Sequence, residues 1–547
     1  MNRKRSIVLS AAVTLLLSGP VVTSAPAGAA APAPPGACGL LADAQVRQYI
    51  SGPGAAALAR QCDRERSGAP YAETQAPTPE GQLASAAAEK SEPGIQAVDV
   101  LVNNRATDTF PRTTQSETST AVRSTTVLVG YNDSGQFLTS GDFSGYSRST
   151  NSGASFTDMG PPTTPLGQIS SVSGDPVMVS DFNRMATDTA LFYMANLATN
   201  AAGTSIIGVH RSGNGGAAPT PWQFGRTASP LAVAGEFQDK EWLAVDNGAT
   251  FPGRLYACWR RFGGANGIQF SRSTDFGLTF TQLAANLSTG TTTVQGCSVD
   301  VDRETGRVLV AWLDSSFNPP QQRAKISTNG GVSFGAEFTI GAANLAETIN
   351  GACGRNVFLD TQAGNTSRAI RSTPFPTVAF RSTNASAYSV WHRAGLAGGS
   401  GADIAFARST NNGTTFGATQ RINSVVTGDQ FFPSIAVNAA GTIRVFYYST
   451  QLDATKRLLN AYFVQSADDG VTWSAPVRVT DVSFDRPITN PNFDISVAGC
   501  YMGDYNDIAA PPSGLGDNAF YMAWGDNRLD ADPGPAIAPD PDIRFDK

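Results

Sequence analysis

The chain contains very little histidine: two residues, His210 and His392, among 547. A zinc site built mainly from histidine needs more than this, so such a site is excluded. A Ser-His-Asp triad would depend on one of these two residues, which argues against that mechanism. We therefore expect His210 and His392 to be surface or packing residues rather than catalysts.

An excess of positive charge is also missing, because 39 Lys and Arg stand against 45 Asp and Glu, giving a net charge of −6. Nucleic-acid-binding proteins normally present a basic face, so we expect no nucleic-acid partner. Beyond the N-terminus, the chain lacks an apolar run long enough to cross a membrane. Residues 3–5 are basic, residues 7–17 are apolar and residues 27–29 read Ala-Gly-Ala. This order is typical of a secretion signal, so we predict a signal peptide over residues 1–30 and a secreted, extracellular protein without an integral membrane segment.

The sequence does contain six copies of one short pattern, Ser-x-Asp/Asn-x-Gly followed by Ser or Thr and an aromatic residue. In a tight turn, an Asp or Asn side chain accepts hydrogen bonds from backbone N–H groups and Gly adopts the positive φ. We therefore predict that each copy is a structural turn between two strands. The copies cover residues 149–156, 273–280, 327–334, 409–416, 466–473 and 212–216, the last with an insertion before its aromatic residue, Trp222.

This pattern resembles the Asp-box, or BNR repeat, of the sialidase-like β-propellers, and the resemblance covers most of the chain from about Glu117 onward. It implies an all-β fold of four-stranded blades. In that family the repeats lie on the face of the propeller away from the ligand site.

Apolar, β-branched runs recur with the spacing expected of propeller blades. They are residues 126–130, 190–194, 254–259, 308–312, 389–391, 443–447 and 520–524. Seven runs predict a seven-bladed propeller, and six blades, the number in catalytic sialidases, is the alternative. The last unit lacks an outer strand, and residues 98–102 are the candidate for closing the ring. Trp242, Trp259, Trp312, Trp391 and Trp524 fall at strand positions and are expected in the core.

The predicted domain organisation has three parts. Residues 1–30 form the signal peptide, residues 31–94 an Ala/Pro-rich leader and linker, and residues 95–547 the propeller. Six cysteines, an even number, fit disulfide bonds in an oxidising compartment. Cys38 and Cys62 bracket a short helical piece and are expected to pair. The other four cysteines, Cys258, Cys297, Cys353 and Cys500, allow three pairings, of which we favour Cys258–Cys297 because both lie in neighbouring repeats; free buried thiols are the alternative.

The topology of a four-stranded blade assigns candidate residues to one face, here called the top face. Loops that lead into the first strand share this face with loops that join the second and third strands, opposite the six repeats. The first set carries Glu117, Asp175, Asp239, Lys240, Glu241, Asp504 and Tyr505. The second set carries Arg260, Arg261, Asp314, Arg323, Arg393, Lys456, Arg457, Asp526 and Arg528. Carboxylates interleaved with arginines suit an acidic sugar, since arginine binds carboxylates in a bidentate manner.

Sialidases hold the substrate carboxylate with three arginines and use a tyrosine, activated by a glutamate, as nucleophile. By residue type and face, the resemblance implies Tyr505 as the nucleophile, Glu241 as its base, and Asp239 or Asp175 as the acid. It implies an arginine clamp and one further substrate-binding carboxylate. Arg260, Arg393 and Arg528 are the candidates for the clamp, and Asp504 is the candidate for the carboxylate.

The sequence therefore predicts a secreted, monomeric, sialidase-like glycoside hydrolase that acts on an acidic glycan or glycoconjugate without a cofactor. The alternative is a non-catalytic propeller that binds a glycan or a protein outside the cell. It is favoured by the lack of the Arg-Ile-Pro-type strand that opens catalytic sialidases, for which Pro111-Arg112 is no equivalent. A structural calcium ion is a third hypothesis, because oxygen ligands suit this ion. Its candidate ligands are Asp526, Asp530, Asp532, Asp540 and Asp542.

Overall fold

A computed structural model describes residues 36–67 and 98–547 of the chain, with gaps. The gaps are residues 109–111, 138–139, 164–166, 184–187, 189–190, 265, 346–347, 350–356, 359–369, 399–400, 457, 486–500, 513–516 and 529–540. The predicted signal peptide and the linker after residue 67 lie outside the described residues and stay predictions.

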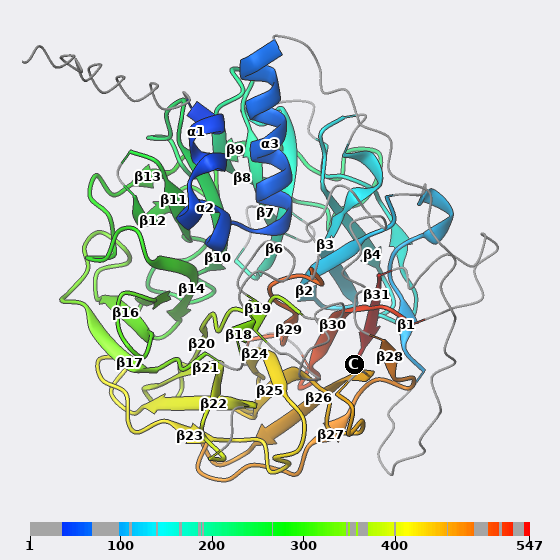
Figure 1. Ribbon diagram of the computed structural model, residues 1–547, viewed down its shortest axis with the longest axis vertical. Helices are drawn as coiled ribbons and strands as arrows, with labels where there is room; N and C mark the ends of the chain where they lie inside the picture. The colour runs from blue at the N-terminus through cyan, green and yellow to red at the C-terminus, as the bar shows by residue number, and fades with distance from the viewer. Residues whose placement is uncertain are drawn as a thin grey trace, which may run out of the picture. The chain divides into compact units, whose positions relative to one another are not determined.

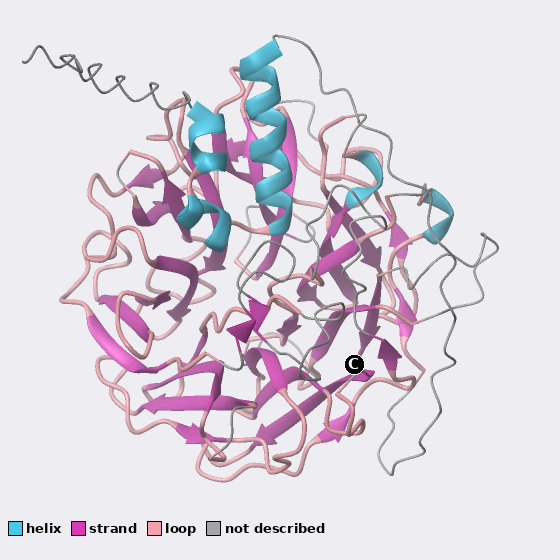
Figure 2. Cartoon of the chain, viewed as in Figure 1, coloured by secondary structure: helices cyan, strands magenta, loops and turns pink. Residues whose placement is uncertain are grey.

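The described part of the chain forms seven antiparallel sheets of four successively paired strands, arranged in a ring as in a seven-bladed β-propeller (Figure 1; Figure 2). This confirms the predicted fold class, and the six-bladed alternative is wrong. The first strands of neighbouring blades contact one another from β2 through β6, β10, β14, β20, β24 and β29 back to β2, so they surround the central axis.

The strands of the seven blades follow one another along the chain. Blade 1 contains β2 (Gln115–Arg123), β3 (Thr126–Asp133), β4 (Ser144–Ser149) and β5 (Thr157–Asp158). Blade 2 contains β6 (Ser171–Asp181), β7 (Leu191–Thr199), β8 (Ser205–Ser212) and β9 (Phe224–Thr227). Blade 3 contains β10 (Phe237–Val245), β11 (Leu255–Phe262), β12 (Gly267–Ser273) and β13 (Thr281–Gln282). Blade 4 contains β14 (Val294–Asp302), β15 (Arg307–Asp314), β16 (Gln321–Ser327) and β17 (Phe338–Ala342).

The remaining blades have the same plan. Blade 5 contains β20 (Thr377–Arg381), β21 (Ser386–Ala394), β22 (Ala402–Ser409) and β23 (Gln420–Arg421). Blade 6 contains β24 (Gln430–Val437), β25 (Ile443–Ser449), β26 (Leu458–Ser466) and β27 (Val477–Arg478), and β28 (Phe484–Asp485) also pairs with β26. Blade 7 contains β29 (Asp507–Ala509), β30 (Tyr521–Asp526), β31 (Asp542–Asp546) and β1 (Val100–Leu101). A separate hairpin consists of β18 (Thr348–Ile349) and β19 (Val357–Phe358).

Strand β1 closes the ring, because the N-terminal end of the propeller supplies the outer strand of the C-terminal blade. Val100 pairs with Phe545 and Leu101 with Arg544, antiparallel. This confirms the closing strand predicted within residues 98–102. A closed ring leaves no edge open between the first and the last blade.

Each of the six repeats connects the third and fourth strands of its blade, as predicted for a turn between strands. In the repeat of blade 3, Gly277 N donates to Ser273 Oγ (2.9 Å), and Ser273 Oγ donates to Asp275 Oδ1 (2.7 Å). The same two hydrogen bonds recur in the other five repeats. The aromatic residue of the repeat packs against the preceding blade, as Phe334 does against Phe270, with ring centroids 4.7 Å apart. The repeats therefore hold neighbouring blades together.

Tryptophans on the second strands form part of the hydrophobic core, where burial of large aromatic surface stabilises the fold. Trp259, Trp312, Trp391 and Trp524 are fully buried, as expected. Trp242 differs, because it lies on the first strand β10 and is only partly buried.

Residues 36–67 form three helices, α1 (Gly36–Ala42), α2 (Ala44–Tyr49) and α3 (Gly52–Ser67), with α3 beside β6 (Figure 1). A disulfide joins Cys38 to Cys62, as predicted, and a second disulfide joins Cys258 to Cys297. The favoured pairing of Cys258 with Cys297 is thus confirmed, and it links β11 of blade 3 to β14 of blade 4. Cys353 and Cys500 lie outside the described residues.

Candidate functional site

A cluster of charged side chains, the Lys240 cluster, lies at the top face where the first strands begin. Lys240 Nζ lies 3.0 Å from Glu117 Oε1, 3.2 Å from Asp504 Oδ2 and 3.5 Å from Asp175 Oδ2. Arg371 adds a second cation, with Nη2 3.1 Å from Asp504 Oδ2. All five members are buried. Burial alone would lower the pKa of Lys240, but Asp175, Asp504 and Glu117 outweigh it and raise this pKa, so the lysine is a cation.

A bulge repeated in the first strands places these residues at the axis. The pairing of the first strand with the second is interrupted in β2, β6 and β10 at Glu117, Asp175 and Lys240. These three residues have φ of 53°, 54° and 53°, in the left-handed region. That conformation costs free energy for residues with a side chain, and such strain is concentrated at functional sites. The bulges of β14 and β24 place Gly296 (φ 62°) and Phe432 (φ 50°) at the corresponding positions.

Asp239, next to Lys240, binds the helical segment instead of facing solvent. Its carboxylate accepts hydrogen bonds from Ser51 N (3.1 Å), from Ser51 Oγ (2.9 Å) and from Gln295 Nε2 (2.9 Å). Burial raises its pKa, and Lys240, Ser51 and Arg371 partly oppose this.

Glu241 and Asp175 are buried carboxyl groups with no hydrogen-bond partner among the described residues. Burial raises the pKa of each of them well above its usual value, and the neighbouring acidic groups contribute to the rise, Asp239 for Glu241 and Glu117 for Asp175. Glu241 also lines a small cavity of about 30 Å³, together with Lys240, His392 and Tyr505. A carboxyl group in such surroundings holds a proton near neutral pH and can donate it.

Tyr505 lies over the same cavity. Its hydroxyl donates to Pro176 O (3.1 Å), and Lys240 Nζ lies 4.5 Å from its ring centroid. Burial raises the pKa of Tyr505 well above its usual value, and Glu117, Asp175 and Glu241 raise it further. The tyrosine is therefore neutral near pH 7.

The three arginines of the predicted clamp lie in different surroundings. Arg260 is buried, its Nη1 donates to Arg261 O (2.8 Å), its Nε has no hydrogen-bond partner in the described part of the chain, and burial lowers its pKa to about 10. Arg393 Nε donates to the carbonyl oxygen of Ala394 (3.3 Å). Arg528 pairs with Asp99 (2.5 Å), Asp481 (2.6 Å) and Asp526 (2.7 Å).

The structure thus brings together five predicted site residues around Lys240: Asp175, Asp239, Glu241, Asp504 and Tyr505. Arg393 and Arg528 bind other partners, so their roles stay predictions. Among the other top-face candidates, Lys456 pairs with Asp429 and Arg323 with Glu337, and Arg457 lies outside the described residues. Sequence reasoning missed Arg371, although it precedes the first strand of blade 5, the place where other blades carry charged residues.

Both histidines are buried packing residues. Burial lowers the pKa of His210 to about 4 and that of His392 to about 3, so both are neutral at pH 7. His392 Nε2 lies 3.0 Å from Ser372 Oγ.

The calcium hypothesis finds its described candidate ligands engaged elsewhere. Asp526 pairs with Arg528 and Asp542 with Arg105. Asp530, Asp532 and Asp540 lie outside the described residues. Within the described ranges, no group of three or more His, Cys, Asp or Glu side chains is placed to hold a metal ion. In the same ranges, no helix is long and apolar enough to span a membrane.

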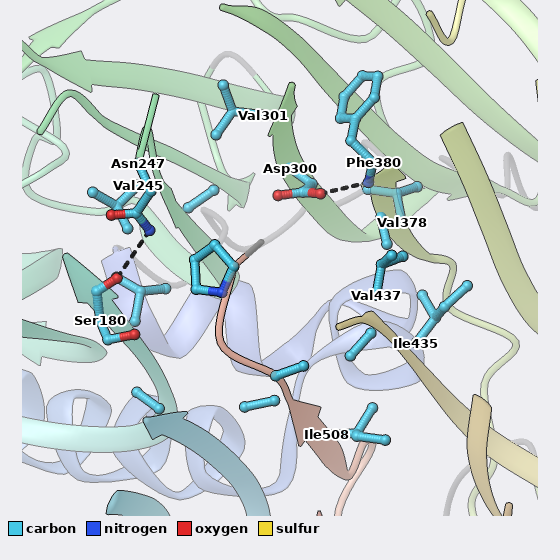
Figure 3. Close-up of a pocket in the computed structure, with 18 of the residues that line it drawn as sticks. Ser180, Val245, Asn247, Asp300, Val301, Val378, Phe380, Ile435, Val437 and Ile508 are labelled. Carbon is cyan, nitrogen blue, oxygen red and sulfur yellow. Dashed lines mark hydrogen bonds between the residues drawn. The ribbon is translucent and has the colours of Figure 1, made fainter. Parts of the chain in front are cut away.

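A second, larger cavity of about 360 Å³ is lined by the first strands and by loops that join first and second strands, and Figure 3 shows part of its lining. The first strands line it with apolar residues that follow the bulges, among them Val245, Val301 and Ile435. Asp300 Oδ2 accepts a hydrogen bond from Phe380 N (2.7 Å) at its wall, and burial raises the pKa of this carboxyl to about 7. Trp242 and Thr377 line both cavities.

Comparison with known proteins does not assign the chain to a family. No model of a protein family and no curated protein matches the chain. Solved structures with some similarity include the α-L-arabinofuranosidase Arb93A from Fusarium graminearum with an iminosugar inhibitor (10% identity, 83% of this chain and 98% of that chain, TM-score 0.39). The Aleuria aurantia lectin with Fucα1-6GlcNAc is 12% identical over 67% of this chain and 96% of its own, with a TM-score of 0.38. The leech intramolecular trans-sialidase, in complex with 2,7-anhydro-Neu5Ac, is 10% identical, and the match covers 69% of this chain and 70% of that chain, with a TM-score of 0.40. These similarities are too low to support an argument on function.

Proposed function

We propose that this protein is a secreted glycoside hydrolase that acts on an acidic glycan, with its active centre at the Lys240 cluster. The observation that carries the proposal is Glu241, a buried carboxyl group without a hydrogen-bond partner among the described residues, beside Tyr505 and a small cavity. Buried titratable groups with strongly shifted pKa values occur preferentially at catalytic sites.

In the proposed mechanism Tyr505 attacks the anomeric carbon and the ionised form of Glu241 takes its proton; because burial raises the pKa of Glu241, this form is the minor one near neutral pH. Both residues line the same cavity, and the charge of Glu241 already acts on the tyrosine hydroxyl. Asp175 is the better candidate for the acid, because its carboxyl lacks a hydrogen-bond partner in the described residues and its pKa is raised, whereas Asp239 is bound by Ser51. A protonated carboxyl can protonate the leaving glycosidic oxygen.

An acidic sugar fits this site because cations lie beside the carboxylates. The Nε of Arg260 is buried and has no hydrogen-bond partner within the described ranges, so it can donate to a substrate carboxylate without first breaking a hydrogen bond at this atom. Arg371 lies on the other side of Asp504. Substrate binding by Arg393, Arg528 and Asp504 follows only from the resemblance to sialidases.

Two further observations support the sialidase-like assignment and an extracellular location. The hydrogen-bonded turns of the six repeats fit the resemblance to the Asp-box. Two disulfides fit an oxidising environment outside the cytosol.

Release of a fluorogenic leaving group from sialosides and from uronic-acid glycosides tests the proposal, with the full secreted chain and with its Ser51→Asp variant, in which each further substitution is also made. We expect Tyr505→Phe to abolish turnover while glycan binding is retained, and Glu241→Gln to lower kcat more than it changes KM. Full activity of Tyr505→Phe would refute the assigned nucleophile.

A non-catalytic glycan-binding propeller is the second candidate. It is favoured because both cations of the Lys240 cluster are already paired with carboxylates of the cluster and because the Arg-Ile-Pro-type strand is missing. Binding on a glycan array, with no hydrolysis of any acidic glycoside by the wild-type chain or by the opened variant described below, would support this candidate and refute the hydrolase.

A further inference from the structure

The helical segment of residues 36–67, here called the cover, is not part of the propeller ring. All four strands of every blade, including the closing strand β1, come from residues 100–546. The disulfide of the cover joins Cys38 to Cys62 within the cover itself, and the second disulfide lies within the propeller. Neither disulfide links the two, so the cover can leave while the ring stays closed.

The cover binds directly on the Lys240 cluster through the turn between α2 and α3. Arg371 Nη1 donates to Ile50 O (2.5 Å) and Nη2 to Tyr49 O (3.2 Å). Ser51 donates twice to Asp239. Two residues of the candidate site thus bind the cover, and without it Arg371 would retain its pairing with Asp504 and Asp239 its hydrogen bond from Gln295.

The cover also packs closely against the propeller. A Cβ atom on Gly174 would lie 2.4 Å from Pro53 Cβ, and one on Gly54 would lie 2.7 Å from Asp239 Oδ1, so these glycines allow the backbones to approach. Ile50, Leu58 and Val46 of the cover belong to one hydrophobic cluster with Tyr193, Phe237 and Trp259 of blades 2 and 3. The cavity beside Glu241, lined by propeller residues such as Thr373, Phe375 and Phe432, measures only about 30 Å³, which is too small for a sugar.

Two buried acids lie close in sequence to residues that contact the cover, Asp175 after Gly174 and Glu241 two residues after Asp239, and their burial favours its release. Glu241 and Asp175 are kept from water without hydrogen-bond partners in the described part of the chain, which costs free energy. Opening the top face would restore their hydration, whereas it would expose the apolar side of the cover. The closed form therefore combines favourable apolar contacts with unfavourable burial of polar carboxyl groups, as expected for a contact that can be released.

We propose that residues 36–67 are an autoinhibitory cover that closes the top face of the propeller and must leave before a ligand reaches the Lys240 cluster. The identity of that ligand as an acidic glycoside rests on the proposed function; the opening itself does not.

Carboxyl labelling with a carbodiimide and glycine ethyl ester, read by peptide mass spectrometry, tests the opening. In Ser51→Asp a carboxylate replaces the hydroxyl that donates to Asp239, so repulsion should displace the cover. We expect labelling of Asp239 and Glu241 at least tenfold above wild type. Ala44→Asp adds the same charge at an exposed position of the cover and should label as wild type. Asp526, buried in blade 7, should stay unlabelled in all variants if the propeller is folded.

A second variant, Cys38→Ser with Cys62→Ser, loosens the cover without touching its contact with Asp239. Labelling of Glu241 in neither variant, with Asp526 protected, would overturn the proposal, as would equal labelling in Ala44→Asp. Glycoside hydrolysis is measured on the same samples. Labelling together with new activity supports both the cover and the hydrolase, whereas labelling without activity on any acidic glycoside keeps the cover and refutes the hydrolase.

Discussion

The substitution Lys240→Met tests whether the lysine neutralises the acids at the centre of the ring. Methionine keeps most of the side-chain volume but removes the ammonium group that lies 3.0–3.5 Å from three carboxylates. Removing one partner of a buried ion pair typically costs about 3–5 kcal/mol, because the remaining charge is left uncompensated. We expect a loss of unfolding free energy of this size at pH 8.

The loss should depend on pH in a defined direction. Lys240 lowers the pKa of Asp175, so without the lysine this pKa rises further in the folded state, which then binds more protons than the unfolded state. Stability must therefore fall as pH rises. Each further unit of folded-state pKa costs about 1.4 kcal/mol above that pKa. The loss should accordingly be smaller at pH 5 than at pH 8, by at least about 1.4 kcal/mol.

Urea denaturation followed by tryptophan fluorescence measures both values. Lys325→Met is the matched control, because Lys325 lies on strand β16 and pairs with no carboxylate among the described residues. It should change stability by less than about 0.5 kcal/mol, as surface substitutions usually do. A loss below about 1 kcal/mol in Lys240→Met at pH 8, or a loss that is equal at pH 5 and pH 8, would refute the assigned role.

Three further predictions concern the frame around the site. Asp275→Ala removes acceptors for Ser273 Oγ, Thr279 N and Thr279 Oγ1, so it should lower the unfolding free energy by about 1–2 kcal/mol without changing ligand affinity; a change in affinity at unaltered stability would contradict a structural role. Gly153→Ala should destabilise more than Gly203→Ala in thermal melts, since both positions have positive φ but only at Gly153 would a Cβ meet Phe545, at 2.1 Å. Burial lowers the pKa of His210 from 6.5 to about 4, so the folded state binds fewer protons than the unfolded state and stability falls as pH drops from 6.5 to 4. In His210→Gln the dependence of the unfolding free energy on pH should therefore be smaller by about 1.4 kcal/mol per pH unit. An unchanged dependence in urea titrations would show that His210 is protonated in the folded state.

The fold was predictable because its signals are local. The six repeats encode their own turns, since Ser273, Asp275 and Gly277 bind one another within five residues. The apolar runs mark the second strands, and the closing strand follows from the one blade that lacks an outer strand. The outer strands β5, β13, β23 and β27, with two residues each, carry no such pattern and are defined only by pairing with the third strands.

The candidate site was predictable only in part. Asp175, Glu241 and Tyr505 were assigned to the top face because strand direction alone decides the face. The position of Lys240 among three carboxylates could not be predicted, because it depends on how three blades pack around the axis. Ser51 was also missed, since its contact with Asp239 spans 188 residues of sequence. The sequence around Ser51 gives no sign of the surface that it covers.

The left-handed bulges connect fold and site. In five of the first strands the bulge occupies an equivalent position, yet only β14 has glycine there, the residue that adopts this conformation without steric cost. Glu117, Asp175 and Lys240 take the same backbone shape with bulky side chains in three consecutive blades. A purely structural bulge would be served better by glycine at each position. Keeping charged residues at strained positions, with their side chains directed at one another, is most simply explained by a function that requires these charges at the axis.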